Sequence, residues 1–475
     1  MTSANPLLKT SPLPHQAPLL TEIRPEHFLP AVAFAIAAAK KEIDAIKNNP
    51  EAPTFENTVE ALEAAGRKLA QLSATFNIMA GVKCEAQTAK IGESIGASLS
   101  AHAHDIINDA ALFNRVKTVH ATDGATLDEE QKTLLERTYK NFIRNGAELS
   151  AEKKKELKKI DAEILRLTGL YQGNILTSAG DYKKIIDDES LLAGVPEIIK
   201  LNYKNAALQK GMSDKWLVEL SPPPREILQY ADNRDLRREV YIAMNSIACD
   251  GPHDNRRLAH DIASLRHRKA NILGHGNYAE MALSENMAKT PATVMEFLRK
   301  ENAECQAQMK GRVREVAALA IQVDGIAKLE PWDFAYYHFK LQQKKFGATA
   351  EDFRPHFPFS AVLEGMFRHA EKLFGIHVTE ETAKYQTYDP SVKVYEVTDK
   401  KTGETLGILY TDYQARPGSK ADGFWMEAFR ERAGKDSPIV INVCNFGGGK
   451  NGEEVSHSLW EILSVFHEFG HALHS

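Results

Sequence analysis

The last segment of the chain carries the feature that most constrains its fold, a pair of histidines one helical turn apart. His467 and His471 are separated by three residues, the first of which is Glu468. Four positions span about one turn of an α-helix, so both imidazoles project from one face if the segment is helical. Two histidines at this spacing can bind one Zn²⁺, and the glutamate lies near the metal without binding it. The segment therefore predicts a helix with a metal site on one face.

The residues around this pair have the pattern of a capped helix. Ser458 followed by Glu461 fits a capping box at the helix start. No Lys or Arg occurs in residues 451–475, so no nearby positive charge competes with a dication. Apolar residues stand on most sides of the helix, which predicts that it is buried. These residues are Leu459, Ile462, Leu463, Phe466, Phe469 and Leu473.

This arrangement supplies the groups that peptide hydrolysis requires at neutral pH. Zinc polarises a carbonyl and lowers the pKa of a bound water to about 7, and Glu468 can act as the general base. We therefore expect His467 and His471 to be the metal ligands, Glu468 to be catalytic, and the cofactor to be one Zn²⁺ per chain. His474 is expected to pack or to support the site rather than to bind metal. The alternative is a pair of ordinary core histidines, because the pattern alone arises by chance in roughly one chain in a hundred.

The second half of the chain also contains short alternating segments rich in β-branched residues and bounded by Gly and Pro. They predict a small sheet just before the metal-binding helix, formed by residues 392–397, 405–411 and 439–444. Residues 439–445 are expected to offer an edge to which an extended peptide adds through backbone hydrogen bonds. The candidate substrate-binding residues on this edge are Ile439, Ile441 and Val443.

Most of the remaining chain predicts helices. Long proline-free segments with apolar residues three and four apart indicate helices at residues 57–80, 85–113 and 127–145. The run Ser221-Pro222-Pro223-Pro224 cannot continue a helix. It predicts a boundary between an N-terminal helical region, residues 1–222, and a metallopeptidase catalytic region, residues 223–475. The expected fold class is mostly α, with a small β element before the metal-binding helix.

The bulk composition argues against several other classes of protein. A formal net charge of −5 repels nucleic acid rather than recruiting it. Residues 28–39 form the most apolar stretch, which is too short to span a bilayer. Residues 1–20 do not have the pattern of a signal peptide. Scattered cysteines without metal-ligand spacing predict free thiols in a reducing compartment, and hence a cytoplasmic location. They are Cys84, Cys249, Cys305 and Cys444.

The metal-binding segment, Phe466-His-Glu-Phe-Gly-His-Ala-Leu-His474, resembles that of the thimet oligopeptidase family of zinc peptidases, most closely its peptidyl-dipeptidase branch. Further segments are similar to landmarks of that family in the same order, so the resemblance spans nearly the whole chain. They are Leu228-Gln-Tyr-Ala-Asp-Asn-Arg-Asp-Leu-Arg237, Met287-Ala-Lys-Thr-Pro291, Pro331-Trp-Asp333, Leu373-Phe-Gly-Ile376 and Asn442-Val-Cys-Asn-Phe446.

The resemblance implies a two-lobed helical fold of the zincin type with a deep channel that admits oligopeptides, and release of dipeptides from peptide C-termini. It implies that His467 and His471 bind zinc and that Glu468 is the base. Family members take a third ligand, a glutamate, from a segment beyond the second histidine, and their oxyanion and substrate groups follow it. This sequence stops at Ser475, so the C-terminal part of the catalytic region is expected to be absent and the zinc affinity and activity of this chain to be weak.

Three other functions stay open at this stage. The chain is expected to act on short peptides, but an endo-acting oligopeptidase of the same family fits the motif equally well. A truncated, non-catalytic peptide-binding remnant is a second alternative. A helical scaffold whose histidines only pack is the third, and stoichiometric zinc binding would separate it from the others.

Overall fold

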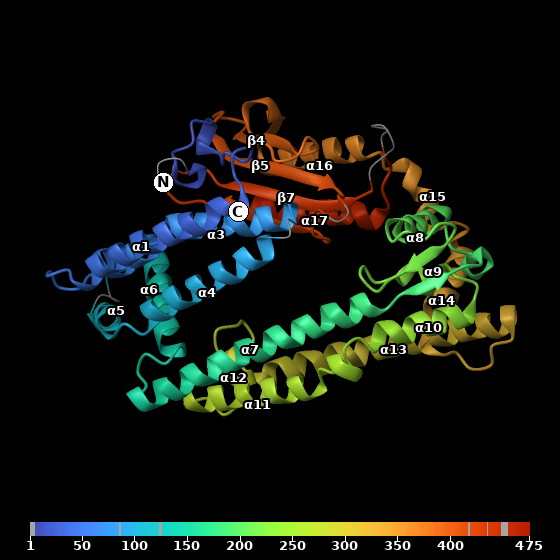
Figure 1. Cartoon of the computed structure of the whole chain (residues 1–475), viewed down its shortest axis with the longest axis horizontal. Coiled ribbons are helices and arrows are strands. Elements are labelled where there is room, and N and C mark those ends of the chain that lie inside the picture. Colours follow the sequence, from blue (N-terminus) through green and yellow to red (C-terminus); the bar gives the residue numbers. More distant parts are fainter. Residues whose placement is uncertain (1–4, 85–86, 123–125, 417–418, 435, 448–454) are drawn as a thin grey trace. The chain divides into compact units, whose positions relative to one another are not determined.

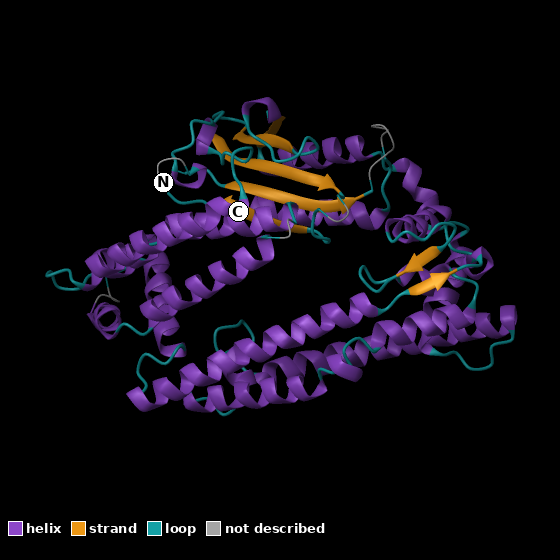
Figure 2. Ribbon diagram, in the orientation of Figure 1, coloured by secondary structure: helices purple, strands orange, loops and turns teal. Residues whose placement is uncertain are grey.

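The computed structural model describes residues 5–84, 87–122, 126–416, 419–434, 436–447 and 455–475. Helices predominate in this part of the chain, as predicted (Figure 2). The chain forms two compact units. The first combines residues 1–147 with residues 350–475, and the second consists of residues 148–349.

The first unit is built on a five-stranded sheet with the strand order β3-β4-β5-β7-β6. β5 and β7 are parallel, and the other neighbours are antiparallel. The predicted strands are thus confirmed, and two further strands, β3 and β6, extend the sheet. The bounds are β3 Ile376–Glu380, β4 Lys393–Asp399, β5 Thr405–Gln414, β6 Trp425–Arg430 and β7 Ile439–Phe446.

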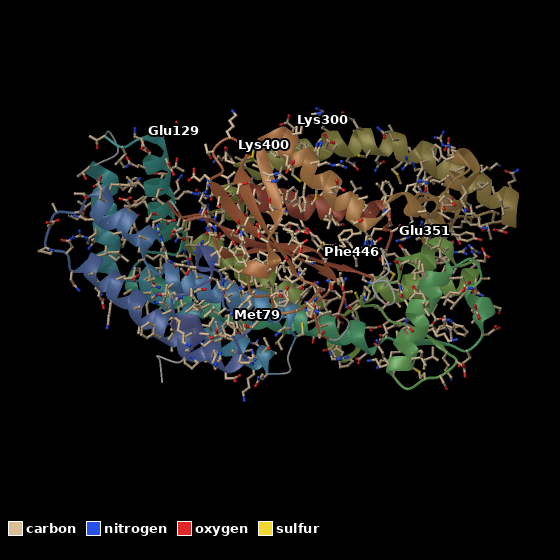
Figure 3. The ribbon with its side chains drawn as sticks, turned by 90° about the horizontal axis from the view of Figure 1, so that it is seen from above. Met79, Glu129, Lys300, Glu351, Lys400 and Phe446 are labelled. Carbon is tan, nitrogen blue, oxygen red and sulfur yellow. The ribbon has the colours of Figure 1, made fainter. Side chains whose placement is uncertain are left out.

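Helices cover both faces of this sheet (Figure 1). α1 (Phe28–Lys47) and α3 (Arg67–Val82) pack on one face, and α16 (Phe359–Phe374) and α17 (Leu459–His474) pack on the other. Two separate apolar cores result. Met79 belongs to the core on the α1 and α3 side and Phe446 to the core on the α16 and α17 side; both side chains are labelled in Figure 3.

Two of the helices predicted in the first unit are broken in the structure, whereas the one predicted at residues 127–145 is confirmed as a single helix, Glu129–Arg144. Residues 57–80 are interrupted at Gly66, whose φ of +75° belongs to the left-handed region where glycine is favoured. Residues 85–113 are interrupted at Asp109, whose carboxylate accepts hydrogen bonds from the amides of Ala111 and Leu112 and so starts a new helix. The helices are η5 Phe55–Glu60, α2 Ala61–Ala64, α4 Thr88–Ile107, α5 Ala110–Thr122, α6 Glu129–Arg144 and α15 Ala350–Phe353.

The second unit is helical apart from one two-stranded antiparallel ribbon, β1 and β2. Residues 221–224 form a loop after β2, inside this unit, and the predicted division of the chain at residue 222 stays a prediction. The bounds are α7 Ala151–Asp181, β1 Lys184–Ile186, α8 Glu197–Gln209, β2 Trp216–Val218, α9 Arg225–Tyr230, α10 Arg234–Asn245, α11 Arg256–Ile272, α12 Tyr278–Leu283, α13 Pro291–Asp324 and α14 Pro331–Phe346.

A buried ion cluster joins α10 to α14 in the second unit. Asp333, which is fully buried, accepts two hydrogen bonds from Arg234, at 2.9 and 2.7 Å, and one from Arg237, at 3.2 Å. The guanidinium of Arg237 also lies over the ring of Tyr336, with 4.0 Å between its Cζ and the ring centroid. Two of the family landmarks quoted above, residues 228–237 and 331–333, therefore meet at one structural contact.

Within the described residues, no helix is both long enough and apolar enough to cross a membrane. The apolar residues 28–39 lie in α1, which turns one side toward the sheet. All four cysteines are free thiols, as predicted, and Cys444 is buried. The cytoplasmic location stays a prediction.

Candidate metal centre on helix α17

α17 begins with the capping box that the sequence predicts. The Ser458 hydroxyl oxygen accepts a hydrogen bond from the amide of Glu461 at 3.3 Å, and the Glu461 carboxylate accepts one from the amide of Ser458 at 2.7 Å. These bonds satisfy two amide groups that a helix start leaves without partners. The cap therefore fixes where the helix begins, and with it the direction in which each later side chain points.

One face of α17 packs against the sheet and the other is exposed. Ile462, Val465 and Phe469 are buried. The prediction that the helix is buried on most sides is wrong, because the sheet covers one side only and no other described segment covers the opposite side. Large apolar side chains of α17 remain exposed, with Trp460 at 71%, and they are Leu459, Trp460, Leu463, Phe466 and Leu473.

The two histidines lie together on the exposed face, as the spacing predicts. Their Nε2 atoms are 3.1 Å apart and their ring centroids 4.7 Å apart. Two zinc ligands at about 2.05 Å in tetrahedral geometry have nitrogen atoms about 3.3 Å apart. The positions of His467 and His471 therefore fit a shared metal ion.

A third ligand is not found in the described part of the chain. No group of three or more His, Cys, Asp or Glu side chains there could hold a metal ion. His474 lies at the end of α17, where it lines an apolar cavity of about 380 Å³ together with Phe469 and Leu473. His474 is itself exposed, and its role in packing or in supporting the site stays a prediction.

Glu468 lies on the same turn as the histidines but points away from solvent. It is only 5% exposed. Burial raises the pKa of its carboxyl, and the two neighbouring histidines oppose this effect when they are charged. A carboxylate with a raised pKa is a stronger base near neutral pH than an ordinary glutamate.

Asn442 on β7 is a site residue whose role the sequence did not predict. Its side-chain amide donates a hydrogen bond to the backbone carbonyl of Glu468 at 2.7 Å, and the residue is fully buried. Its Oδ1 is also buried and has no hydrogen-bond partner in the described structure. The available signal was a single amide inside the apolar run of residues 439–444. The bond ties the helix at Glu468 to the middle of the sheet.

The structure contradicts the predicted peptide-binding edge. β7 is an inner strand, because it pairs with β5 on one side and with β6 on the other. Ile439, Ile441 and Val443 are at most 1% exposed and belong to the core on the α1 and α3 side. Their alternation identifies a strand, but a nearly continuous apolar run is typical of a strand that is covered on both faces. These three residues are therefore core residues.

The sequence of this chain was compared with known protein families and proteins, and the following matches are all peptidases. The sequence model of Peptidase family M3 matches residues 227–475. The dipeptidyl carboxypeptidase of Escherichia coli (strain K12) is 31% identical over 481 residues, which cover 100% of this chain and 70% of the relative. Oligopeptidase A of Salmonella typhimurium strain LT2 is 30% identical over 481 residues, covering 99% and 70%. A solved structure, PZ peptidase A with inhibitor 2, aligns with a TM-score of 0.37 and 12% identity over 95% of this chain and 62% of that chain.

Proposed function

Because the chain belongs to Peptidase family M3, as its motifs predicted, we propose that it serves zinc-dependent hydrolysis of peptide bonds in short oligopeptides. The observation that carries the proposal is the pair of imidazole nitrogens 3.1 Å apart on the exposed face of α17, with Glu468 on the same turn. A scaffold helix has no need of two exposed histidines at ligand spacing beside a buried carboxylate.

His467 and His471 are the residues that would hold the metal. When bound, Zn²⁺ supplies Lewis-acid polarisation of a peptide carbonyl and of a water molecule. Both imidazoles must be neutral to bind it, so zinc binding is expected to weaken as the pH falls.

Glu468 is proposed to be the general base and then the general acid. Its carboxylate takes a proton from the attacking water and gives it to the nitrogen of the leaving amine, so that the peptide bond breaks without releasing an amide anion. Asn442 supports this role, because its bond to the Glu468 carbonyl limits movement of the backbone from which the carboxylate extends.

Two cleavage specificities are candidates for this chain. The relatives that align over the whole chain are named dipeptidyl carboxypeptidase and oligopeptidase A, at 31% and 30% identity. We propose release of C-terminal dipeptides first, and internal cleavage by an endopeptidase as the alternative. A peptide with an amidated C-terminus separates them, because amidation removes the terminal charge that a peptidyl-dipeptidase would need to bind. Loss of cleavage on amidation supports the first, and unchanged cleavage supports the second.

The test of the base is the substitution Glu468→Gln, made in a form of the chain that cleaves a quenched fluorescent peptide. Glutamine keeps the shape and removes the basic oxygen, so kcat is expected to fall by about 10²- to 10⁴-fold while bound zinc, measured by atomic absorption, is unchanged. Glu431→Gln, at an exposed glutamate outside α17, serves as the matched control. Near-normal turnover in the Glu468 variant would show that another group is the base.

A further inference from the structure

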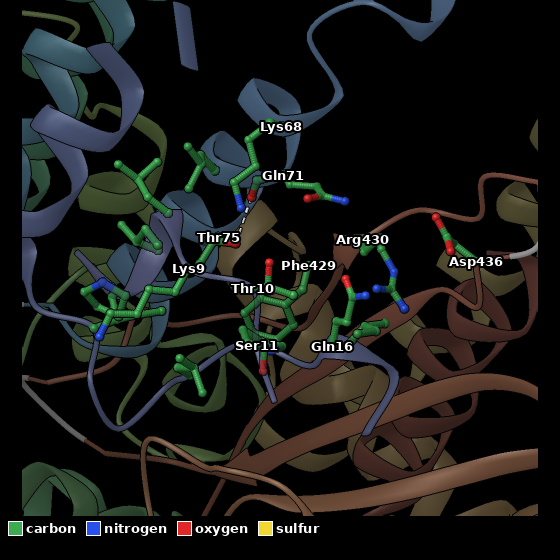
Figure 4. A pocket seen from close by; sticks show the side chains of 18 residues that line it. Lys9, Thr10, Ser11, Gln16, Lys68, Gln71, Thr75, Phe429, Arg430 and Asp436 are labelled. Carbon is green, nitrogen blue, oxygen red and sulfur yellow. Dashed lines mark hydrogen bonds between the residues drawn. The ribbon is translucent and has the colours of Figure 1, made fainter. Parts of the chain in front are cut away.

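A cavity of about 400 Å³ lies in the first unit, on the face of the sheet that α1 and α3 cover. Four segments line it. They are the N-terminal arm, which we define as residues 5–24, the first turns of α3, the end of β6 with the loop that follows, and Ile439 at the start of β7 (Figure 4). Its size is in the range of small-molecule sites. α17 packs on the opposite face of the sheet, so this cavity is separate from the candidate metal centre.

Positive charge dominates the lining. Among the described residues of the lining, Lys9, Lys68 and Arg430 contribute three cations, and Asp436 is the one acidic residue. Within the described residues none of the three cations forms an ion pair. Arg430 uses its Nε and Nη2 to donate to the carbonyl of Ser437, at 3.1 and 2.7 Å, which leaves Nη1 without a protein acceptor. The lining thus has two positive charges in excess.

Of these three cations Arg430 is half-buried, whereas Lys9 and Lys68 are exposed. Lys68 is exposed, but the protein atoms around its amine still lower the pKa of that amine. Burial lowers the pKa of Arg430 as well, against the opposing influence of Asp436. An anion bound beside the free Nη1 of Arg430 would offset this loss of solvation.

The rest of the lining combines hydrogen-bond donors with apolar surface. Thr10 and Ser11 provide hydroxyl groups, and Gln71 provides a side-chain amide (Figure 4). Ser11 accepts a hydrogen bond from the amide of Leu13 at 3.2 Å, so its own hydroxyl hydrogen is available to a ligand. Buried side chains of Leu72 and Phe429 form the apolar part. A ligand that matches both kinds of surface has charged groups attached to a short carbon skeleton.

We propose that this cavity binds a small organic dianion, a phosphate monoester or a dicarboxylate, held by ion pairs with Lys68 and Arg430. The two excess charges of the lining balance the two charges of such a ligand, and the hydroxyl and amide groups complete its hydrogen bonds. The site joins the N-terminal arm to α3 and β6, so an occupied site holds the arm against the sheet.

The test is isothermal titration of the purified chain, without added zinc, at about 20 mM salt to limit screening. The probes are glycerol 3-phosphate, malate and, as a neutral control, glycerol. We expect at least one of the two dianions to bind one to one with Kd below about 1 mM, and glycerol not to bind. Binding of glycerol 3-phosphate alone assigns the site to phosphate esters, and binding of malate alone assigns it to dicarboxylates.

Three variants locate the binding. Lys68→Gln and Arg430→Gln should each weaken it by at least ~10-fold, because each removes a charge-assisted contact. Lys41→Gln removes the same charge from an exposed position on α1 outside the cavity and should change Kd by less than ~2-fold. Arg430→Lys, which keeps the charge, is the second variant if Arg430→Gln does not fold. The proposal is overturned if neither dianion binds at about 10 mM, or if the Lys41 variant weakens binding as much as the Lys68 variant.

Discussion

Glu461 holds the start of α17 through several polar contacts. Its carboxylate accepts hydrogen bonds from the amide and the hydroxyl of Ser458, at 2.7 and 2.8 Å, and lies 3.1 Å from Arg354 Nη1. Burial by itself would raise the pKa of this carboxyl. The interaction with His457, whose Nδ1 lies 3.6 Å from Glu461 Oε1, and the hydrogen bonds from Ser458 outweigh burial and lower the pKa to about 2.

This lowered pKa makes part of the stability depend on pH. A carboxyl with a pKa of about 2 in the folded chain and an ordinary value of 4.5 when unfolded stabilises the fold above about pH 4.5, and this contribution is lost as the pH falls toward 2. Urea unfolding at pH 7 should show Glu461→Gln less stable than the parent chain by about 1–3 kcal/mol. The difference should shrink steadily in measurements at about pH 5, 4 and 3.

The control for this prediction is Glu431→Gln, at an exposed glutamate outside α17. It should not reproduce the pH-dependent difference. A stability gap between the parent chain and Glu461→Gln that is the same at pH 7 and pH 3 would mean that shape, rather than charge, is what the capping residue contributes.

The sequence predicts the contact between Ser458 and Glu461, which are close in the chain, but not the contact between Arg354 and Glu461. Ser458 and Glu461 are three residues apart, so their pairing follows from helix geometry alone. Arg354 is 107 residues away from Glu461, and no periodicity in the chain relates the two. The same distinction separates the two histidines, which the sequence places correctly, from Asn442, which reaches Glu468 only because the sheet and α17 pack together.

At the scale of helices and strands, local patterns identify an element more reliably than its neighbours. β7 is where the alternation predicts a strand, but pairing on both sides depends on β6, whose residues 425–430 carry too weak an alternation to be recognised. The sequence analysis did not predict the helix breaks at Gly66 and Asp109, although in this case the signal is local. Their turn chemistry is local, yet apolar residues continue on both sides of it and suggest one longer helix.

The contact between α10 and α14 gives a prediction at this scale. Asp333→Ala removes the only acidic partner that the structure gives to Arg237, which is 1% exposed, and leaves a buried charge uncompensated. We expect a loss of about 3–5 kcal/mol in the stability of the second unit. Hydrogen exchange of peptides from α10 and α14 measures it, since both should exchange faster in the variant.

The matched control is Asp235→Ala, at an exposed position in the first turn of α10, the helix that carries Arg237. It loses only the favourable interaction of a carboxylate with a helix start, about 0.3–1 kcal/mol. Equal exchange in the two variants would mean that the buried ion cluster adds no more stability than a surface carboxylate.

For the molecule as a whole, the candidate metal centre has fewer ligands in the described residues than a catalytic zinc site needs. Catalytic zinc normally has three protein ligands, and α17 supplies two. We therefore predict that this 475-residue chain binds zinc weakly and exchangeably, with an affinity at least ~100-fold below that of a three-ligand site, and has little peptidase activity.

Calorimetric zinc titration of the parent chain and of His474→Ala measures this. The alanine variant should bind zinc as weakly as the parent chain, since no group of three ligating side chains, with or without His474, is found among the described residues. Tight one-to-one binding that disappears in His474→Ala would contradict the prediction and identify His474 as the third ligand. His467→Ala should abolish specific binding in either case.

Alternate residues of β7 face opposite sides of the five-stranded sheet and so belong to the two different apolar cores of the first unit. Its odd positions Ile439, Ile441 and Val443 belong to the core beside α1 and α3, whereas its even positions Val440, Cys444 and Phe446 belong to the core beside α16 and α17. Asn442 is even, and so it faces the carbonyl of Glu468. A slip of one residue in strand pairing would exchange the two sets, leave the Asn442 amide among apolar side chains and place a valine or isoleucine against that carbonyl. The pairing register of one inner strand therefore sets the alignment of the helix that carries the histidines.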